Sequence, residues 1–139
     1  MSITFDSDTI RKINVFEEIT GVEVQDCIIN DDSAHFVVSD DKVGMAVGKG
    51  GSTIQKVQDN LDMDVRVYGD ADDIEGFVDN LVPADINGVE VEVEDGEETA
   101  VIYVDGDQRS RVVGRGGETI ELVERFLQKE FDVDAVRVE

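Results

Sequence analysis

One segment of this chain occurs twice, and the repeat is the strongest constraint on its fold. Residues 34–61 align without a gap with residues 100–127, at a constant offset of 66. A repeat at a fixed offset indicates two copies of one small folding unit. We therefore place a boundary near residue 70, which gives domains 1–70 and 71–139. The positions that are identical in both copies include Ala34 and Ala100, Val38 and Val104, Val47 and Val113, Gly48 and Gly114, Gly50 and Gly116, Gly51 and Gly117, Thr53 and Thr119, Ile54 and Ile120, Val57 and Val123, and Leu61 and Leu127.

Each copy has the same predicted series of elements: helix, strand, strand, helix, helix, strand. Hairpin strands are expected at 22–29 and 34–39 in copy one, and at 89–94 and 99–104 in copy two. A short helix, a glycine-rich loop and a longer helix follow, and strands at 65–67 and 136–138 close the copies. The predicted fold class is α+β. The first helix of each copy has apolar residues at helical spacing, Ile10, Ile13 and Phe16 in one and Ile74, Phe77, Val78 and Leu81 in the other.

Valine alternates with glutamate along residues 89–94. This period of two predicts a strand whose valine face packs on helices while its glutamate face meets water. We interpret these glutamates as solvated surface. Because a unit of about 70 residues buries only around 60% of its unfolded surface, we also expect the two domains to pack against each other.

The charge of the chain is strongly negative, with 34 acidic against 12 basic side chains in 139 residues and a formal net charge of -22. Self-repulsion of this size opposes folding in dilute buffer, but a Debye length of only about 3 Å at 1 M salt screens it. We interpret the acidity as an adaptation to salt. A disordered acidic tail is disfavoured, because 40% of the residues are hydrophobic.

The rarity of cysteine and histidine excludes several classes of site. The single cysteine, Cys27, cannot form an internal disulfide, and with the single histidine, His35, it cannot build a zinc site. No apolar stretch approaches the roughly 18 residues of a membrane span. The first residues, 1–6, lack the basic and apolar regions of a signal peptide. We expect a soluble cytoplasmic protein with no membrane partner.

Two glycine loops carry the strongest chemical signal, Val47-Gly48-Lys49-Gly50-Gly51 and Val113-Gly114-Arg115-Gly116-Gly117. Glycine reaches positive φ and lets another backbone come close, while free amides at the start of the next helix favour an anion. A plain tight turn is the alternative for a single copy. The recurrence with one base at the same place favours a sugar-phosphate backbone as the ligand.

Basic residues gather at these loops. Residues 42–58 and 108–117 contain no acid, although about one residue in four of the chain is acidic. Such local positive sites on an anionic chain are typical of a polyanion-binding protein. The two windows hold six of the twelve bases, Lys42, Lys49 and Lys56 in the first and Arg109, Arg111 and Arg115 in the second.

The order strand, strand, helix, Gly-x-x-Gly loop, helix, strand, with an aliphatic residue before the first glycine, resembles the KH domain of RNA-binding proteins. The element order is similar to the type II variant, and two such units in tandem resemble the short archaeal NusA-type transcription factors. The resemblance implies that each loop clamps about four nucleotides of single-stranded RNA. It implies backbone contacts at residues 48–51 and 114–117, and groove residues at Val47, Ile54, Val113 and Ile120.

The same resemblance implies a function. It suggests a protein of a salt-loving archaeon that acts on nascent RNA in transcription elongation, termination or antitermination, with RNA polymerase as a further partner. The bacterial members carry additional RNA-binding modules, for which 139 residues leave no room. Two alternatives remain open: an RNA-binding factor in ribosome assembly or RNA processing, and a protein-interaction module that docks on a basic partner. A monomer is favoured.

Catalysis and cofactors are not expected. The segment Gly44–Gly50 approaches a P-loop but fails on spacing and lacks Ser or Thr after the lysine. The pairs Asp31-Asp32 and Asp40-Asp41 lie at predicted turns and are interpreted as solvated. His35 and Cys27 lie in predicted strands. His35 is interpreted as packed or at a sheet edge, and Cys27 as a small core residue, while Arg66 and Arg137 extend the RNA track or stay hydrated.

The two loops are predicted to differ in affinity. Glu118, Glu121 and Glu124 follow the second loop where the first has Ser52, Gln55 and Gln58. A carboxylate at a helix start competes with phosphate for the same amides. We therefore expect the first domain to contribute more affinity for RNA.

Overall fold

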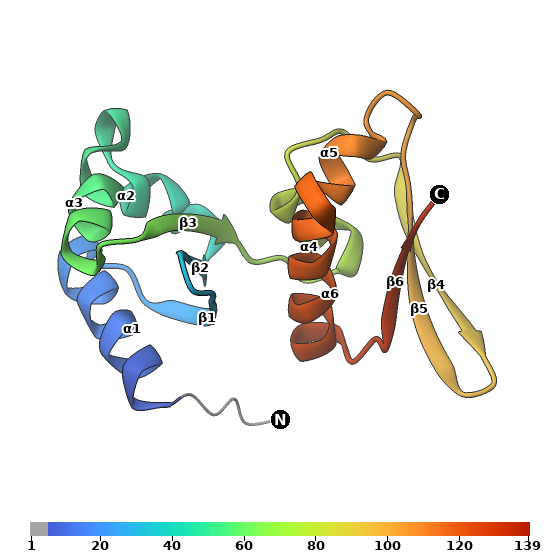
Figure 1. Cartoon of the computed structure of the whole chain (residues 1–139), viewed down its shortest axis with the longest axis horizontal. Helices are drawn as coiled ribbons and strands as arrows, with labels where there is room; N and C mark the ends of the chain where they lie inside the picture. Colours follow the sequence, from blue (N-terminus) through green and yellow to red (C-terminus); the bar gives the residue numbers. More distant parts are fainter. Residues whose placement is uncertain (1–5) are drawn as a thin grey trace. The chain divides into compact units, whose positions relative to one another are not determined.

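The chain folds into two compact units, Met1–Asp70 and Ala71–Glu139. A computed structural model describes residues 6–139, so the prediction about a signal peptide falls on residues that lie almost wholly outside the described part. Each unit has the order α, β, β, α, α, β (Figure 1). The predicted α+β class is confirmed. The expectation that the two domains pack against each other stays a prediction.

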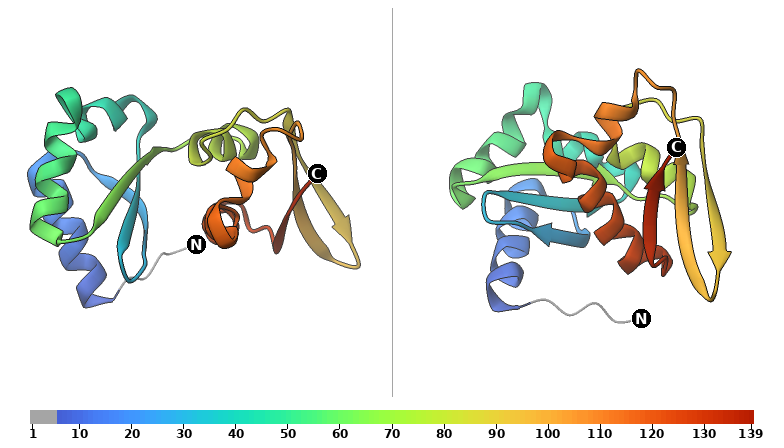
Figure 2. Two further views of the ribbon diagram at one scale, coloured as in Figure 1. Left: turned by 45° about the horizontal axis from the view of Figure 1, so that its top comes forward. Right: turned by 45° about the vertical axis from the view of Figure 1, so that its right-hand side comes forward.

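The first unit is a three-stranded sheet with helices on one face (Figure 2). The central strand β2 pairs antiparallel with β1 and parallel with β3. Short 3-10 turns precede α2 and α3. The elements are α1 (Ser7–Thr20), β1 (Val24–Ile29), β2 (Ser33–Val38), α2 (Val43–Val47), α3 (Ser52–Leu61) and β3 (Asp64–Gly69).

The second unit repeats this topology. Strand β5 lies in the centre, antiparallel to β4 and parallel to β6. The parallel pairing of the closing strand, present in both units, brings it beside the second hairpin strand. The elements are α4 (Ile74–Leu81), β4 (Gly88–Glu94), β5 (Glu97–Tyr103), α5 (Arg109–Val113), α6 (Glu118–Phe131) and β6 (Ala135–Val138).

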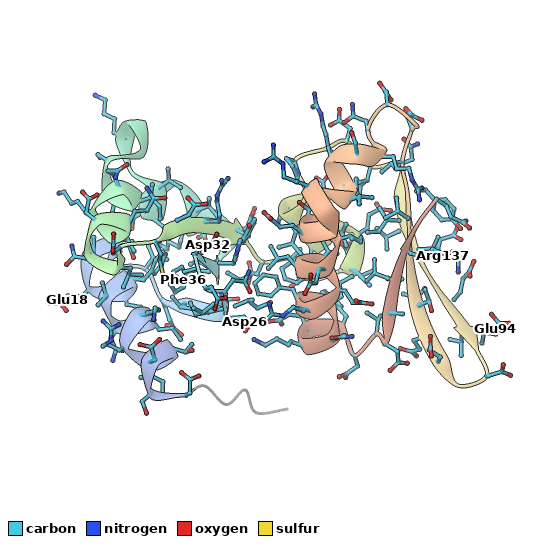
Figure 3. All side chains as sticks on the ribbon, viewed as in Figure 1. Glu18, Asp26, Asp32, Phe36, Glu94 and Arg137 are labelled. Carbon is cyan, nitrogen blue, oxygen red and sulfur yellow. The ribbon has the colours of Figure 1, made fainter. Side chains whose placement is uncertain are left out.

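Phenylalanines fill the space between sheet and helices. In the first unit the rings of Phe16 and Phe36 stack with centroids 4.3 Å apart, and both side chains are buried. Figure 3 labels Phe36 inside this unit. In the second unit Phe77 packs edge-on against Phe126, with centroids 6.1 Å apart. Cys27 is buried in the core of the first unit, which confirms its interpretation as a core residue.

Aspartate begins the first helix of each unit. The Asp6 carboxylate accepts a hydrogen bond of 2.8 Å from the Thr9 amide, and this bond lowers the pKa of Asp6. Asp73 caps α4 in the same way, accepting from the Gly76 amide at 2.7 Å. Both caps satisfy an amide that the first helical turn leaves without a partner. In the second unit α4 ends at Leu81, two residues before Pro83.

The prediction that the valine face of residues 89–94 is packed is wrong for its outer half. Val91 is 44% exposed and Val93 is 66% exposed. Helix α6 runs beside β6, and β4 is the strand farthest from it in every view (Figures 1 and 2). The alternation therefore predicted the strand correctly, but the covering helix does not reach the whole strand.

The helices α3 and α6 are each followed by an aspartate in the left-handed region at the C-cap, Asp62 with φ 54° and Asp132 with φ 55°. The left-handed backbone and the negative charge both lower the stability of the folded state. An L-residue is strained in this region, and a negative charge interacts unfavourably with the dipole at a helix C-terminus. We expect Asp62→Gly to raise the free energy of unfolding by about 0.5–1 kcal/mol. Urea unfolding should show this gain, and it should shrink as KCl screens the charge.

Asp59→Gly is the matched control, because it removes the same charge from an exposed position inside the same helix. Glycine in a helix interior costs about 1 kcal/mol, so this variant should be less stable than the parent. Equal shifts for the two variants would show that charge alone, and not backbone conformation, governs this helix end.

No helix among residues 6–139 is long and apolar enough to cross a membrane.

Candidate nucleic-acid interface

The two glycine loops have the same backbone conformation. The first glycine has φ 79° and ψ 169° at Gly48, and φ 78° and ψ 173° at Gly114. The second glycine of each loop, Gly50 or Gly116, has φ 61° or 63°, so it too lies where glycine is favoured. The repeat in sequence is therefore also a repeat in backbone geometry. In the first unit the loop forms an outer tip between α2 and α3 (Figure 1).

A threonine packs directly over the first glycine of each loop. A Cβ at Gly48 would lie 2.2 Å from the Thr53 Oγ1 atom, and one at Gly114 would lie 2.3 Å from that of Thr119. The threonine thus occupies space that any other residue would need for its side chain. The sequence contains a signal for this role, because a threonine stands five residues after the first glycine in both copies.

The second glycine of each loop lies in open space, in contrast to the first. A Cβ at Gly50 or at Gly116 would meet no atom within 4 Å, and both residues are exposed. No side chain caps the helix that follows either loop. Each loop therefore presents open backbone beside uncapped first-turn amides, an arrangement that suits an anion such as a phosphate.

The bases at the first loop are exposed and unpaired. Within residues 6–139, Lys42, Lys49 and Lys56 form no ion pair. This is notable in a chain with 34 acidic residues, where four bases outside the loops pair with carboxylates. Arg11 and Lys12 pair with Asp8, Arg66 pairs with Asp64, and Arg137 pairs with Glu92 and Glu139. The loop lysines are therefore available to an external anion.

The second loop has two such bases and one with a structural contact. Arg111 and Arg115 are exposed and, in the described part of the chain, without an ion pair. Arg109 instead donates a hydrogen bond of 2.9 Å to the Val138 carbonyl and so ties α5 to β6. If Arg109 contacts RNA as predicted, its guanidinium does so while it is hydrogen-bonded to Val138.

The glutamates after the second loop divide into two groups. Glu118 and Glu121 lie in the first turn of α6, whereas the first turn of α3 has no acid. Glu124 instead accepts a hydrogen bond of 3.3 Å from the Val136 amide. In the first unit the equivalent residue, Gln58, accepts one of 3.1 Å from the Val65 amide. Glu124 thus anchors the closing strand, and only the other two lie near the helix start.

Apolar side chains support both loops. The four residues that the resemblance assigns to the groove are half-buried, while Ala46 and Val112 are fully buried one position before Val47 and Val113. Met45 in α2 is 54% exposed, and its Cε atom lies 3.3 Å from where a Cβ at Gly21 would stand, at the end of α1. Arg111 occupies its place in the second unit. The four half-buried residues are Val47, Ile54, Val113 and Ile120.

The remaining candidates lie elsewhere. His35 is half-buried in β2, where its Nε2 lies 3.0 Å from the Ser33 hydroxyl and its Nδ1 lies 2.9 Å from that of Tyr68. Burial raises the pKa of Tyr68 to about 12. The carboxylate of Glu92, accepting a hydrogen bond from Arg137, raises the pKa of that guanidinium. No group of three or more His, Cys, Asp or Glu residues between 6 and 139 could hold a metal ion.

The chain resembles known proteins over almost its whole length. The family model of the KH domain matches residues 10–79. A protein of Halococcus morrhuae named "Probable transcription termination protein NusA" is 34% identical over 99% of both chains. A protein of the same name from Halobacterium salinarum is 31% identical over 99% of both chains, and one from Methanocaldococcus jannaschii is 28% identical over 95% of this chain and 73% of its own.

A solved structure shares the fold. The structure titled "Crystal structure of APE1850" superposes with a TM-score of 0.87 and 30% sequence identity, over 97% of this chain and all of that one. The glycine loops, the element order and these relatives lead to the same assignment. The chain belongs to the KH-domain family and, within it, to the archaeal NusA-like proteins.

Proposed function

We propose that the chain is a tandem of two type II KH domains that binds single-stranded RNA through both glycine loops. The family match at residues 10–79 supports the first domain. Support for the second is the identical element order and the matching backbone angles of its loop. The central observation is that bases without ion pairs flank exposed glycine backbone, whereas four bases elsewhere in the chain pair with carboxylates.

In this proposal the loop and the groove have different tasks. The open backbone at Gly50 and Gly116 lets the sugar-phosphate chain come close, and the uncapped amides with the adjacent bases hold the phosphates. The half-buried apolar residues next to each loop form the floor on which unpaired bases rest.

The names of the relatives suggest the biological setting. The three archaeal relatives described above are named as probable transcription termination proteins. We infer that this chain acts on nascent transcripts in elongation, termination or antitermination, next to RNA polymerase. We also infer that its net charge of -22 is an adaptation to high salt.

High salt favours amide contacts over charge contacts. Neutralising six phosphates with six bases would give a slope of about −4 for the logarithm of the binding constant against that of salt, using roughly −0.7 for each contact with a single strand. We expect a shallower slope, because hydrogen bonds from backbone amides release no counterions.

Fluorescence anisotropy with a labelled single-stranded oligoribonucleotide, from 0.2 to 3 M KCl, tests both the binding of single-stranded RNA and its shallow dependence on salt. The matched control is the same oligonucleotide annealed to its complement, because pairing hides the base edges that a groove would read. We expect the duplex to bind at least roughly tenfold more weakly, the discrimination expected of unpaired-base recognition. Equal binding of duplex and single strand would contradict the proposed KH mode, and a slope of −4 or steeper would contradict the role of the amides.

A further inference from the structure

The hairpin of the second unit leaves one strand largely uncovered. Strand β4 exposes every residue from Glu90 to Glu94, including two valines. The matching strand of the first unit differs, because β1 buries Asp26, Cys27 and Ile28 and has a register shift between Val24 and Asp26. Exposure of β4 is thus a specific feature of the second unit and not a property of the shared topology.

The register of the hairpin shows which backbone groups face outward. Asp95 and Gly96 form the two-residue turn, with Glu94 opposite Glu97. Along β4, the glutamates therefore exchange hydrogen bonds with β5, while the valines direct their N–H and C=O groups to the open edge. The Val89 amide confirms this direction, because it donates to the Glu75 carboxylate at 3.1 Å instead of to β5.

The part of the edge beyond Val89 is available for pairing. Strand β4 is the last strand of its sheet, so Val91 and Val93 present two N–H and two C=O groups in ladder geometry. Their side chains are 44% and 66% exposed on one face. Such an edge is a template for another extended chain.

The opposite face of the same strand determines the chemistry of the partner. Glu90, Glu92 and Glu94 line it. Glu92 already pairs with Arg137 at 3.0 Å and Glu90 accepts a hydrogen bond from the Tyr103 hydroxyl, whereas Glu94 lies opposite a second acid, Glu97. Glu94 projects from the hairpin (Figure 3). Like charges directly across a strand pair are destabilising, which disfavours a second copy of this chain at the edge, since its own glutamates would face these. Lysine or arginine on the added strand would be favourable.

We propose that the open edge of β4, from Val91 to Glu94, binds an extended segment of a partner protein in which basic residues alternate with apolar ones. Its backbone pairs with Val91 and Val93, its apolar side chains cover the two valines, and its basic side chains meet the glutamate face. This site is separate from the glycine loops, and binding there leaves the RNA contacts free.

A synthetic peptide of alternating lysine and valine tests the proposal on the full chain, in 1 M KCl. Amide hydrogen exchange followed by NMR should show at least roughly tenfold slower exchange at Val91 and Val93 when the peptide is saturating. The Val89 amide, already bonded to Glu75, is the internal control and should change little. A peptide of the same composition with N-methylated valines should bind at least tenfold more weakly, because it cannot complete the ladder.

Two variants separate backbone pairing from charge. Val91→Pro removes an outward N–H without breaking a bond to β5, and should abolish peptide binding while RNA binding is unchanged. Glu94→Gln with Glu97→Gln keeps the backbone and the Arg137–Glu92 ion pair intact, and should weaken peptide binding roughly threefold. Full binding of the N-methylated peptide, or no protection at Val91 and Val93, would overturn the proposal. Protection that rises with protein concentration in the absence of peptide would assign the edge to a second copy and would also overturn it.

Discussion

Replacing Lys49 and Gly50 together by aspartate should reduce the affinity for single-stranded RNA at least about 100-fold, because the change removes one phosphate contact and places two carboxylates against the RNA backbone. Both positions are exposed and lie at the centre of the first loop. Anisotropy titration with a single-stranded oligoribonucleotide would measure the loss. A variant that still binds like the parent would show that the first loop does not contact RNA.

The double variant is expected to keep its fold. Gly50 has φ 61° and ψ 22°, and Asp132 already adopts φ 55° and ψ 27° elsewhere in the chain. A side chain at Gly50 would meet no atom within 4 Å. Gly50→Asn is the matched control, since asparagine tolerates the left-handed region and adds no charge. It should keep most of the affinity, and both variants should have the circular dichroism spectrum of the parent.

The same substitution in the second loop should have a smaller effect. Arg115→Asp with Gly116→Asp changes the equivalent positions, but Glu118 and Glu121 already weaken the helix start for phosphate. We expect roughly a tenfold loss of affinity, against 100-fold for the first loop. A larger loss from the second loop would contradict the predicted dominance of the first domain. If neither loop affected RNA binding, protein docking would become the better hypothesis.

The local backbone of the loops could be predicted from the sequence because it depends on neighbouring residues. Positive φ at three loop positions needs glycine, and the sequence provides it twice at an offset of 66. The hairpins could be predicted for the same reason, since a two-residue turn and a period of two are local signals. Boundaries differed by one or two residues, as at β1, which begins at Val24 and not at residue 22.

Features that depend on distant contacts could not be predicted. The exposure of Val91 and Val93 depends on which strand the helix α6 covers, and alternation along β4 contains no information about that. The hydrogen bond of Arg109 to Val138 joins residues far apart in sequence. Lys56 and Leu122 occupy equivalent positions in the two units, yet one is exposed and the other buried. An identical register in the long helices therefore did not ensure identical packing.

Gly48→Ala should be the most destabilising single substitution in the loops, lowering the free energy of unfolding by about 3 kcal/mol or more. Two costs add up at this position. With φ 79° and ψ 169°, the residue lies in a region that is essentially reserved for glycine. A Cβ there would also lie 2.2 Å from the Thr53 Oγ1 atom and 2.8 Å from the Thr53 backbone nitrogen.

Gly50→Ala is the matched control, because this position has a positive φ but no atom close to an added Cβ. It therefore separates the cost of the backbone conformation from the cost of the steric clash. Its left-handed φ costs about 1–2 kcal/mol, and no atom opposes the added methyl group. Thr53→Ser should not rescue Gly48→Ala, because the backbone nitrogen still blocks the Cβ. Urea unfolding of the three variants would measure this order, and Gly114→Ala with Gly116→Ala would repeat it in the second unit. Equal costs at Gly48 and Gly50 would show that the loop rearranges freely. The expected order would mean that the fold requires glycine at position 48. At position 50 the space around the residue is open, and a ligand can approach the backbone there.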